Sequence, residues 1–81
     1  MRFVLSPRFL ENYKEAPEAV RRAFDKRVRL LENNLRHPSL HAKKYDEAQD
    51  IWQARVNKSW RFYFAIKADT YVILTLQPHP K

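Results

Sequence analysis

Residues 51–66 read Ile51-Trp-Gln-Ala-Arg-Val56, Asn57-Lys-Ser59 and Trp60-Arg-Phe-Tyr-Phe-Ala-Ile66, and this stretch decides the fold. Large apolar residues alternate with polar ones on both sides of the central break, which is the period of a half-buried β-strand. A break of three residues suits a tight hairpin. The stretch therefore predicts two antiparallel strands, with Val56 opposite Trp60 and Arg55 directly opposite Arg61 on the polar face.

The predicted pairing of Arg55 with Arg61 is the most informative feature of the sequence. Like charges directly opposite each other destabilise a pair of strands. Two guanidinium groups held together are well suited to a phosphate, because each presents planar, charged hydrogen-bond donors. We therefore predict that the two arginines bind a phosphate together.

The composition limits the classes of protein to consider. A chain of 81 residues predicts one domain spanning residues 1–81. The sequence has no cysteine and no glycine, which excludes a disulfide framework, a thiolate metal site and a glycine-rich phosphate loop. The net charge of +7 favours nucleic acid or another polyanion as a partner. The apolar runs are too short for a membrane span or a secretory signal, so we expect no membrane association and a cytoplasmic location.

The remaining segments predict two helices and two more strands. Residues 2–5 are expected to form a strand, and Ser6-Pro7 to start a short helix with an N-cap and a first-turn proline. A longer helix is expected from residue 18 to near Arg36, because its apolar residues recur every three or four positions. Residues 37–50 are expected to form a loop and residues 70–76 the last strand. The order β-α-α-β-β-β predicts an α+β fold, with a helical hairpin packed on one face of an antiparallel sheet.

The predicted core lies between the long helix and one face of this sheet. The helix contributes an apolar stripe, made of Val20, Phe24, Val28, Leu31 and Leu35. The hairpin contributes the apolar face made of Trp52, Ala54, Val56, Trp60, Phe62, Phe64 and Ile66. We therefore interpret the aromatic residues of the hairpin as core packing rather than as platforms for stacking bases.

The register of the last two strands follows from aligning their apolar faces. We expect Phe64 to pair with Leu74 and Ile66 to pair with Val72. A slip of one residue would move every side chain to the other face of the sheet. The expected register thus decides which polar side chains meet.

The same register gathers functional side chains at one end of the polar face. Gln77 is expected opposite Arg61, with His79 beyond it, Arg55 across the hairpin and Gln53 further along the strand. Arginines can stabilise charge that develops on phosphoryl oxygens, and imidazole can move a proton near neutral pH. The three histidines lack the spacing of metal ligands. The set therefore suits cleavage of RNA by its own 2′-hydroxyl, with no metal and no cofactor expected.

The chain as a whole resembles the RelE/ParE superfamily of bacterial toxins from type II toxin–antitoxin systems. The resemblance rests on the order of Ser6-Pro-Arg-Phe-Leu10, His37-Pro-Ser-Leu-His-Ala-Lys-Lys44, Asp50-Ile-Trp-Gln-Ala-Arg55 and Trp60-Arg-Phe-Tyr-Phe64 before a final strand that ends near a histidine. It implies a microbial RNase-like fold. In the RelE branch it also implies ribosome-dependent cleavage of mRNA in the A site, with a cognate antitoxin, mRNA and the ribosome as partners.

The resemblance implies roles for individual residues. Arg55, Arg61 and His79 match catalytic positions of relatives, and no acidic residue near Arg55 matches the general base of some members. The candidate RNA-binding residues are His41, Lys43, Lys44, Gln53, Lys58 and Trp60. The tail, Pro80-Lys81, lacks the aromatic residue that relatives commonly carry beyond the last strand.

Two other functions stay open at this point. A ParE-like inhibitor of DNA gyrase would need no catalytic site of its own. A catalytically degenerate basic module would bind RNA with an affinity that falls steeply with salt and would cut nothing. The set of two arginines and a histidine favours the nuclease.

Overall fold

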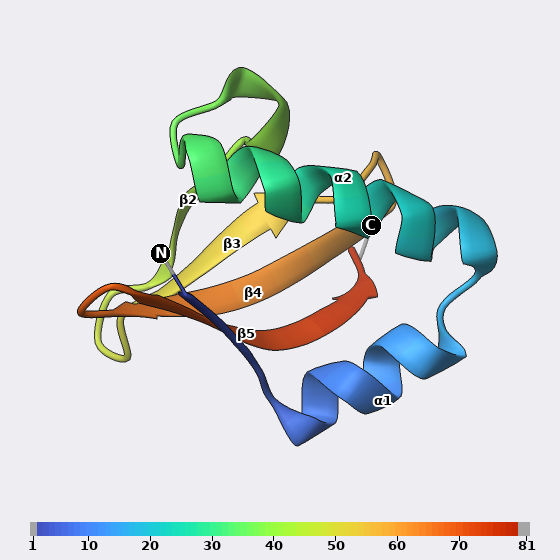
Figure 1. Ribbon diagram of the computed structural model, residues 1–81, viewed down its shortest axis with the longest axis horizontal. Coiled ribbons are helices and arrows are strands. Elements are labelled where there is room, and N and C mark those ends of the chain that lie inside the picture. The colour runs from blue at the N-terminus through green and yellow to red at the C-terminus, as the bar shows by residue number, and fades with distance from the viewer. Residues whose placement is uncertain (1, 80–81) are drawn as a thin grey trace.

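The computed structural model describes residues 2–79, and Met1 and the tail residues Pro80 and Lys81 lie outside the described part. Two helices and a five-stranded sheet make up the fold (Figure 1). The elements are β1 (Arg2–Leu5), α1 (Pro7–Glu15), α2 (Glu18–Asn33), the 3-10 turn η1 (Pro38–Leu40), β2 (Lys43–Asp46), β3 (Ile51–Arg55), β4 (Trp60–Lys67) and β5 (Thr70–Pro78). The strand order is β1-β5-β4-β3-β2. Neither helix in residues 2–79 has the length and apolar character needed to cross a membrane.

The predicted α+β class and helical hairpin are confirmed, and the sheet differs from the expectation in two ways. β1 pairs parallel with β5, so the sheet is mixed rather than antiparallel. Residues 43–46, which were expected to lie in a loop, form β2 and pair antiparallel with β3. The sequence pattern does not predict this strand, because Lys43-Lys-Tyr-Asp46 shows no apolar alternation. Edge strands commonly carry charged residues, which discourage pairing with other chains.

Ser6 fixes the start of α1, as the sequence predicts. Its Oγ accepts a hydrogen bond from the backbone N–H of Phe9 at 3.0 Å and donates one to the carbonyl oxygen of Leu74 at 2.7 Å.

At the other end of the helical hairpin, α2 stops at Asn33, before the predicted end near Arg36. The backbone of Asn34 is extended there, and its side chain accepts a hydrogen bond from the N–H of Arg36 at 2.9 Å, which favours a turn over a further helical residue.

The core lies where both helices meet one face of the sheet. Phe24 in α2 connects the layers, because its ring centroid lies 4.9 Å from that of Phe9 in α1 and 5.1 Å from that of Phe62 in β4. The predicted core residues are confirmed: Val20, Phe24, Leu31, Ala54, Val56, Phe62 and Phe64 are buried, and Val28, Leu35, Trp52, Trp60 and Ile66 pack partly buried against them. Each large apolar side chain buried here stabilises the fold by about 1.5–3 kcal/mol.

The predicted register is confirmed at the end of the sheet that holds the two arginines. Arg61 lies opposite Arg55 on one side and opposite Gln77 on the other. The backbone N–H of His79 donates to the carbonyl oxygen of Ser59 at 2.6 Å, so the chain after β5 runs beside the hairpin turn.

At the other end of β4 and β5 the predicted register is wrong by one residue. The pairs predicted as Phe64–Leu74 and Ile66–Val72 are Phe64–Ile73 and Ile66–Tyr71. Leu74 is the extra residue of a β-bulge, and its carbonyl oxygen accepts the hydrogen bond from Ser6. Because the bulge adds one residue to β5, the register changes only on one side of Leu74, and the pairing at Arg61 is as predicted.

Candidate functional site

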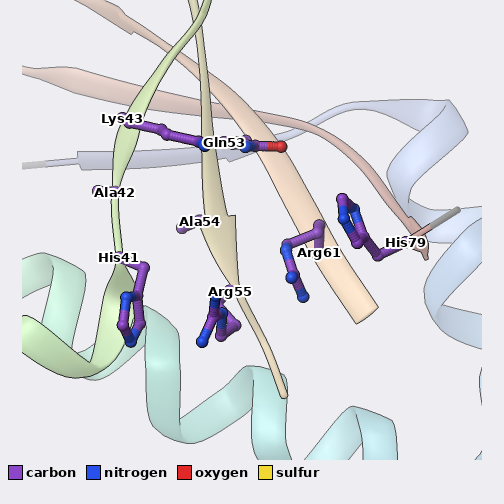
Figure 2. Close-up of a pocket in the computed structure, with 8 residues that line it drawn as sticks. All are labelled: His41, Ala42, Lys43, Gln53, Ala54, Arg55, Arg61 and His79. Atoms are coloured by element: carbon purple, nitrogen blue, oxygen red, sulfur yellow. The ribbon is translucent and has the colours of Figure 1, made fainter. Parts of the chain in front are cut away.

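A basic pocket of about 410 Å³ lies at the end of β3 and β4, where Arg55 faces Arg61. Its lining residues come from the η1–β2 connection, β2, β3, β4 and the segment just after β5, and are His41, Ala42, Lys43, Gln53, Ala54, Arg55, Arg61 and His79 (Figure 2). Five of these eight side chains are cationic or imidazole, and none is a carboxylate. A concave surface with one sign of charge concentrates ions of the opposite sign, so the pocket suits an anion.

Arg61 is the fixed member of the arginine pair. It is only 8 % exposed, and its Nη1 donates to the carbonyl oxygens of Asn57 at 2.8 Å and Trp60 at 3.0 Å. Burial lowers the pKa of Arg61, and the positive charge of Arg55 lowers it further. The guanidinium stays charged, because the ordinary pKa of arginine lies far above neutrality. Since only Nη1 is bonded among the described residues, Nε and Nη2 remain for a ligand.

Arg55 lacks the internal hydrogen bonds that hold Arg61. Its Nε is buried and has no hydrogen-bond partner within residues 2–79. A buried donor without a partner costs about 1–3 kcal/mol, and a like charge directly across the strands adds to that cost. The ion pairs found in the described part of the chain involve only Arg22 and Lys44 as cations. An anion bound between the arginines would therefore offset both costs.

Two histidines face the pocket from different elements. His79 is exposed just after β5, and in Figure 2 its imidazole lies beside Arg61. His41 follows η1 with a left-handed backbone, φ 47°, which is uncommon for a residue other than glycine. Its N–H donates to the carbonyl oxygen of Pro38 at 3.2 Å, and this turn directs the chain into β2. His37 serves the same turn: its Nδ1 accepts a hydrogen bond from the N–H of Ser39 at 3.1 Å.

The pocket gathers six of the nine candidate residues from the sequence, namely His41, Lys43, Gln53, Arg55, Arg61 and His79. Lys58 is outside it, exposed in the hairpin turn. Trp60 is also outside, packed against the core as the strand alternation predicted.

Lys44 is the third candidate outside the pocket. It pairs with Trp52 across β2 and β3, and its Nζ lies 5.2 Å from the centre of the Trp52 ring. It forms an ion pair with Asp50 and a longer one, 3.9 Å, with Glu47. The hydrogen bond to Asp50 raises the pKa of Lys44, so its charge is already satisfied. The sequence alone does not distinguish Lys43 from Lys44, because only a strand at residues 43–46 directs their side chains to opposite faces.

A second cavity, of about 490 Å³, differs in chemistry from the basic pocket. It lies between β1, α1 and α2, and its lining is Phe3, Leu5, Phe9, Leu10, Tyr13, Phe24, Asp25 and Val28. Its one carboxylate accepts hydrogen bonds from the Tyr13 hydroxyl at 3.0 and 3.2 Å. Of these two cavities, the basic pocket therefore carries the side chains suited to catalysis on an anion.

The comparisons with known proteins concern the fold. The sequence matches no protein-family model and no curated protein. Among solved structures, a YoeB/ParE toxin from Agrobacterium tumefaciens superposes with a TM-score of 0.82 at 10% identity, covering 99% of this chain and 100% of that one. YafQ from E. coli gives 0.81 at 16% identity, covering 98% and 94%, and an archaeal RelE from a RelE–RelB complex of Pyrococcus horikoshii gives 0.78 at 20%, covering 95% and 92%. The chain has the fold of the RelE/ParE superfamily toxins, and the resemblance seen in the sequence is confirmed at the level of the fold.

Proposed function

We propose that this protein is the toxin of a type II toxin–antitoxin system and acts as a ribosome-dependent endoribonuclease on mRNA, without a metal ion. The observation that carries the proposal is the pocket in which Arg55, Arg61 and His79 meet. The likeness to RelE, YoeB and YafQ toxins over nearly the whole chain supports it. The proposed target, mRNA on ribosomes, places the protein in the cytoplasm.

The proposed reaction is a transesterification within the RNA. The ribose 2′-oxygen attacks the neighbouring phosphorus, the bond from phosphorus to the 5′-oxygen breaks, and the products are a 2′,3′-cyclic phosphate and a 5′-hydroxyl. Arg55 and Arg61 would bind the non-bridging oxygens, whose negative charge grows in the transition state. Burial strengthens this interaction, because the local dielectric is lower than in water.

His79 is the proposed proton-transfer group. A proton must leave the 2′-hydroxyl and another must reach the departing 5′-oxygen. General acid–base catalysis of this kind contributes about 10²- to 10⁴-fold in rate. The backbone N–H of His79 is held by the carbonyl oxygen of Ser59. Figure 2 shows the His79 imidazole beside Arg61.

The proposed partner, besides mRNA and the ribosome, is a cognate antitoxin. The solved relatives include a RelE–RelB complex and a YoeB–YefM complex from Staphylococcus aureus. An acidic segment that folds over the basic pocket would neutralise its charge and block access of RNA. The net charge of +7 supports an acidic partner of this kind.

The test is induced expression in a bacterial host, with growth measured beside primer extension on a reporter mRNA. The variants are Arg55→Met, which removes one phosphate ligand, and Arg29→Met, which removes the same charge from an exposed position in α2. Wild type and Arg29→Met should arrest growth and cut the message within codons, and Arg55→Met should do neither.

The alternatives give different results in the same experiment. Arrest without cut message, together with loss of supercoiling activity of purified gyrase, would establish the ParE-like inhibitor. Absence of arrest at normal expression of a folded protein would favour the basic RNA-binding module.

A further inference from the structure

Tyr45 is an exposed aromatic side chain with no place in the core. It is 61% exposed, and the other large exposed apolar residues within 2–79 are aliphatic: Val4, Leu5 and Leu10, all in β1 and α1. Tyr45 lies in β2, at the opposite edge of the sheet. Exposing this ring to water has no benefit for folding, and a ligand that covers it would account for its position.

The structure places Tyr45 on the same face of the sheet as the basic pocket. Its ring rests edge-on against Tyr63, with the ring centroids 4.8 Å apart and an angle of 69° between the planes. Tyr63 is two residues beyond Arg61 in β4, and side chains two residues apart point to the same face. Two residues advance a strand by about 7 Å, which is comparable with the step between neighbouring phosphates of an extended single strand.

The alternation of β2 puts Tyr45 on this face, because Tyr45 lies two residues beyond Lys43, whose side chain lines the pocket. Lys43 pairs with Gln53 and Lys44 with Trp52, but the next pair is Asp46 with Ile51, so Tyr45 is the extra residue of the bulge. A bulge leaves its extra residue without a direct partner on the neighbouring strand, so no residue of β3 lies opposite Tyr45, and its ring reaches Tyr63 in β4.

We propose that Tyr45 is a stacking platform for one base of the RNA whose phosphate occupies the pocket, an inference that rests on the proposed function. Aromatic side chains bind single-stranded nucleic acid by stacking on successive bases with little dependence on sequence. Tyr63 packs against the Tyr45 ring and is itself only 7% exposed, so the platform is held in place before RNA binds. The cationic pocket alongside selects a nucleotide rather than an apolar peptide as the occupant.

The test is binding of short single-stranded oligoribonucleotides, measured by fluorescence anisotropy with 2′-O-methyl groups that prevent cleavage. Tyr45→Ala should weaken binding about 5- to 150-fold, which corresponds to ~1–3 kcal/mol for one stacked base. Tyr45→Phe should stay within about twofold of wild type, because the ring is kept. The matched control is Leu10→Ala, which trims a side chain that is 51% exposed in α1.

A series of oligonucleotides with one abasic position each identifies the stacked base. When the base that stacks on Tyr45 is missing, wild type and Tyr45→Ala should bind the oligonucleotide with the same affinity. A double-mutant cycle gives this result for a direct contact. The salt dependence of binding should be the same for Tyr45→Ala and wild type, whereas Arg55→Met should lower the slope by about one counterion.

The outcomes separate this inference from the proposed function. Equal binding by Tyr45→Ala, or equal weakening on every abasic RNA, overturns the stacking role even where the message is cut as proposed. Coupling between Tyr45 and one base with no cleavage of mRNA upholds the platform and overturns the nuclease. A wild-type protein that binds no RNA at low salt overturns both.

Discussion

Replacing Arg55 with methionine should make the protein more stable while abolishing its activity. Arg55 lies directly opposite Arg61 across the strands, and its buried Nε has no hydrogen-bond partner in the described residues. Methionine keeps an unbranched apolar stem and removes both the charge and the orphaned donor. A change that stabilises the fold cannot lose activity through unfolding, which makes Arg55→Met the sharpest test of the pocket.

The size of the effect follows from the two costs that the substitution removes. An unsatisfied buried donor costs about 1–3 kcal/mol, and cross-strand side-chain pairs contribute on the scale of about 0.2–1 kcal/mol. Allowing for packing contacts that the longer arginine makes, we expect a gain of about 1–2 kcal/mol in the free energy of unfolding. For a domain of this size, that gain raises the melting temperature by about 4–16 °C.

Thermal and urea unfolding, followed by circular dichroism, measure this difference. Arg29→Met is the control for the loss of one positive charge, and its free energy of unfolding should stay within about 0.5 kcal/mol of wild type. Added inorganic phosphate should raise the melting temperature of wild type more than that of Arg55→Met, because a ligand stabilises only the state that binds it. If Arg55→Met is less stable than Arg29→Met, Arg55 supports the fold and the reasoning fails.

Three further predictions concern the elements that position the pocket. Ser6→Ala removes the N-cap of α1 and the donor to the Leu74 bulge, and urea unfolding should show a loss of about 1–2 kcal/mol; an unchanged midpoint would contradict the capping role. Asn57→Ala leaves the N–H groups of Ser59 and Trp60 without their acceptor and should lower the free energy of unfolding by about 1 kcal/mol. Cleavage should also be slower, because the backbone carbonyl that holds Arg61 moves. Stability and cleavage equal to wild type would refute this. Burial and the hydrogen bond to Asp25 raise the pKa of Tyr13 above its ordinary value of 10.0, so its contribution to stability is complete below that pH and is lost as the pH rises through the folded-state pKa. Tyr13→Phe should therefore flatten the alkaline fall of the unfolding free energy, and a curve parallel to wild type would exclude this contribution.

The hairpin and its arginine pair could be predicted because they depend on local rules. Alternation with a period of two defines the faces of β3 and β4, and the three-residue break fixes their register. The pairing of Arg55 with Arg61 follows from these two facts alone. The position of Gln77 opposite Arg61 was also predicted correctly, although the prediction took the pairing along the whole of β5 to be regular.

The features that escaped prediction depend on contacts between distant parts of the chain. The bulge at Leu74 is held by Ser6, which lies 68 residues away in sequence. β2 forms because β3 offers it an edge to pair with, and its own charged residues carry no strand signal. For the same reason the sequence could not separate Lys43, which lines the pocket, from Lys44, which binds Asp50 on the other face. The unpartnered Nε of Arg55 is likewise visible only once the side chains are packed.

The most direct test of the central claim is the rate of mRNA cleavage on purified, programmed ribosomes by His79→Ala. The matched control is Gln77→Ala, an exposed neighbour in β5 that lies opposite Arg61 and outside the pocket lining. We predict that His79→Ala lowers the cleavage rate about 10²- to 10⁴-fold without changing the cut positions, while Gln77→Ala stays within about twofold of wild type. Cleavage of the message by His79→Ala at the wild-type rate would contradict the account.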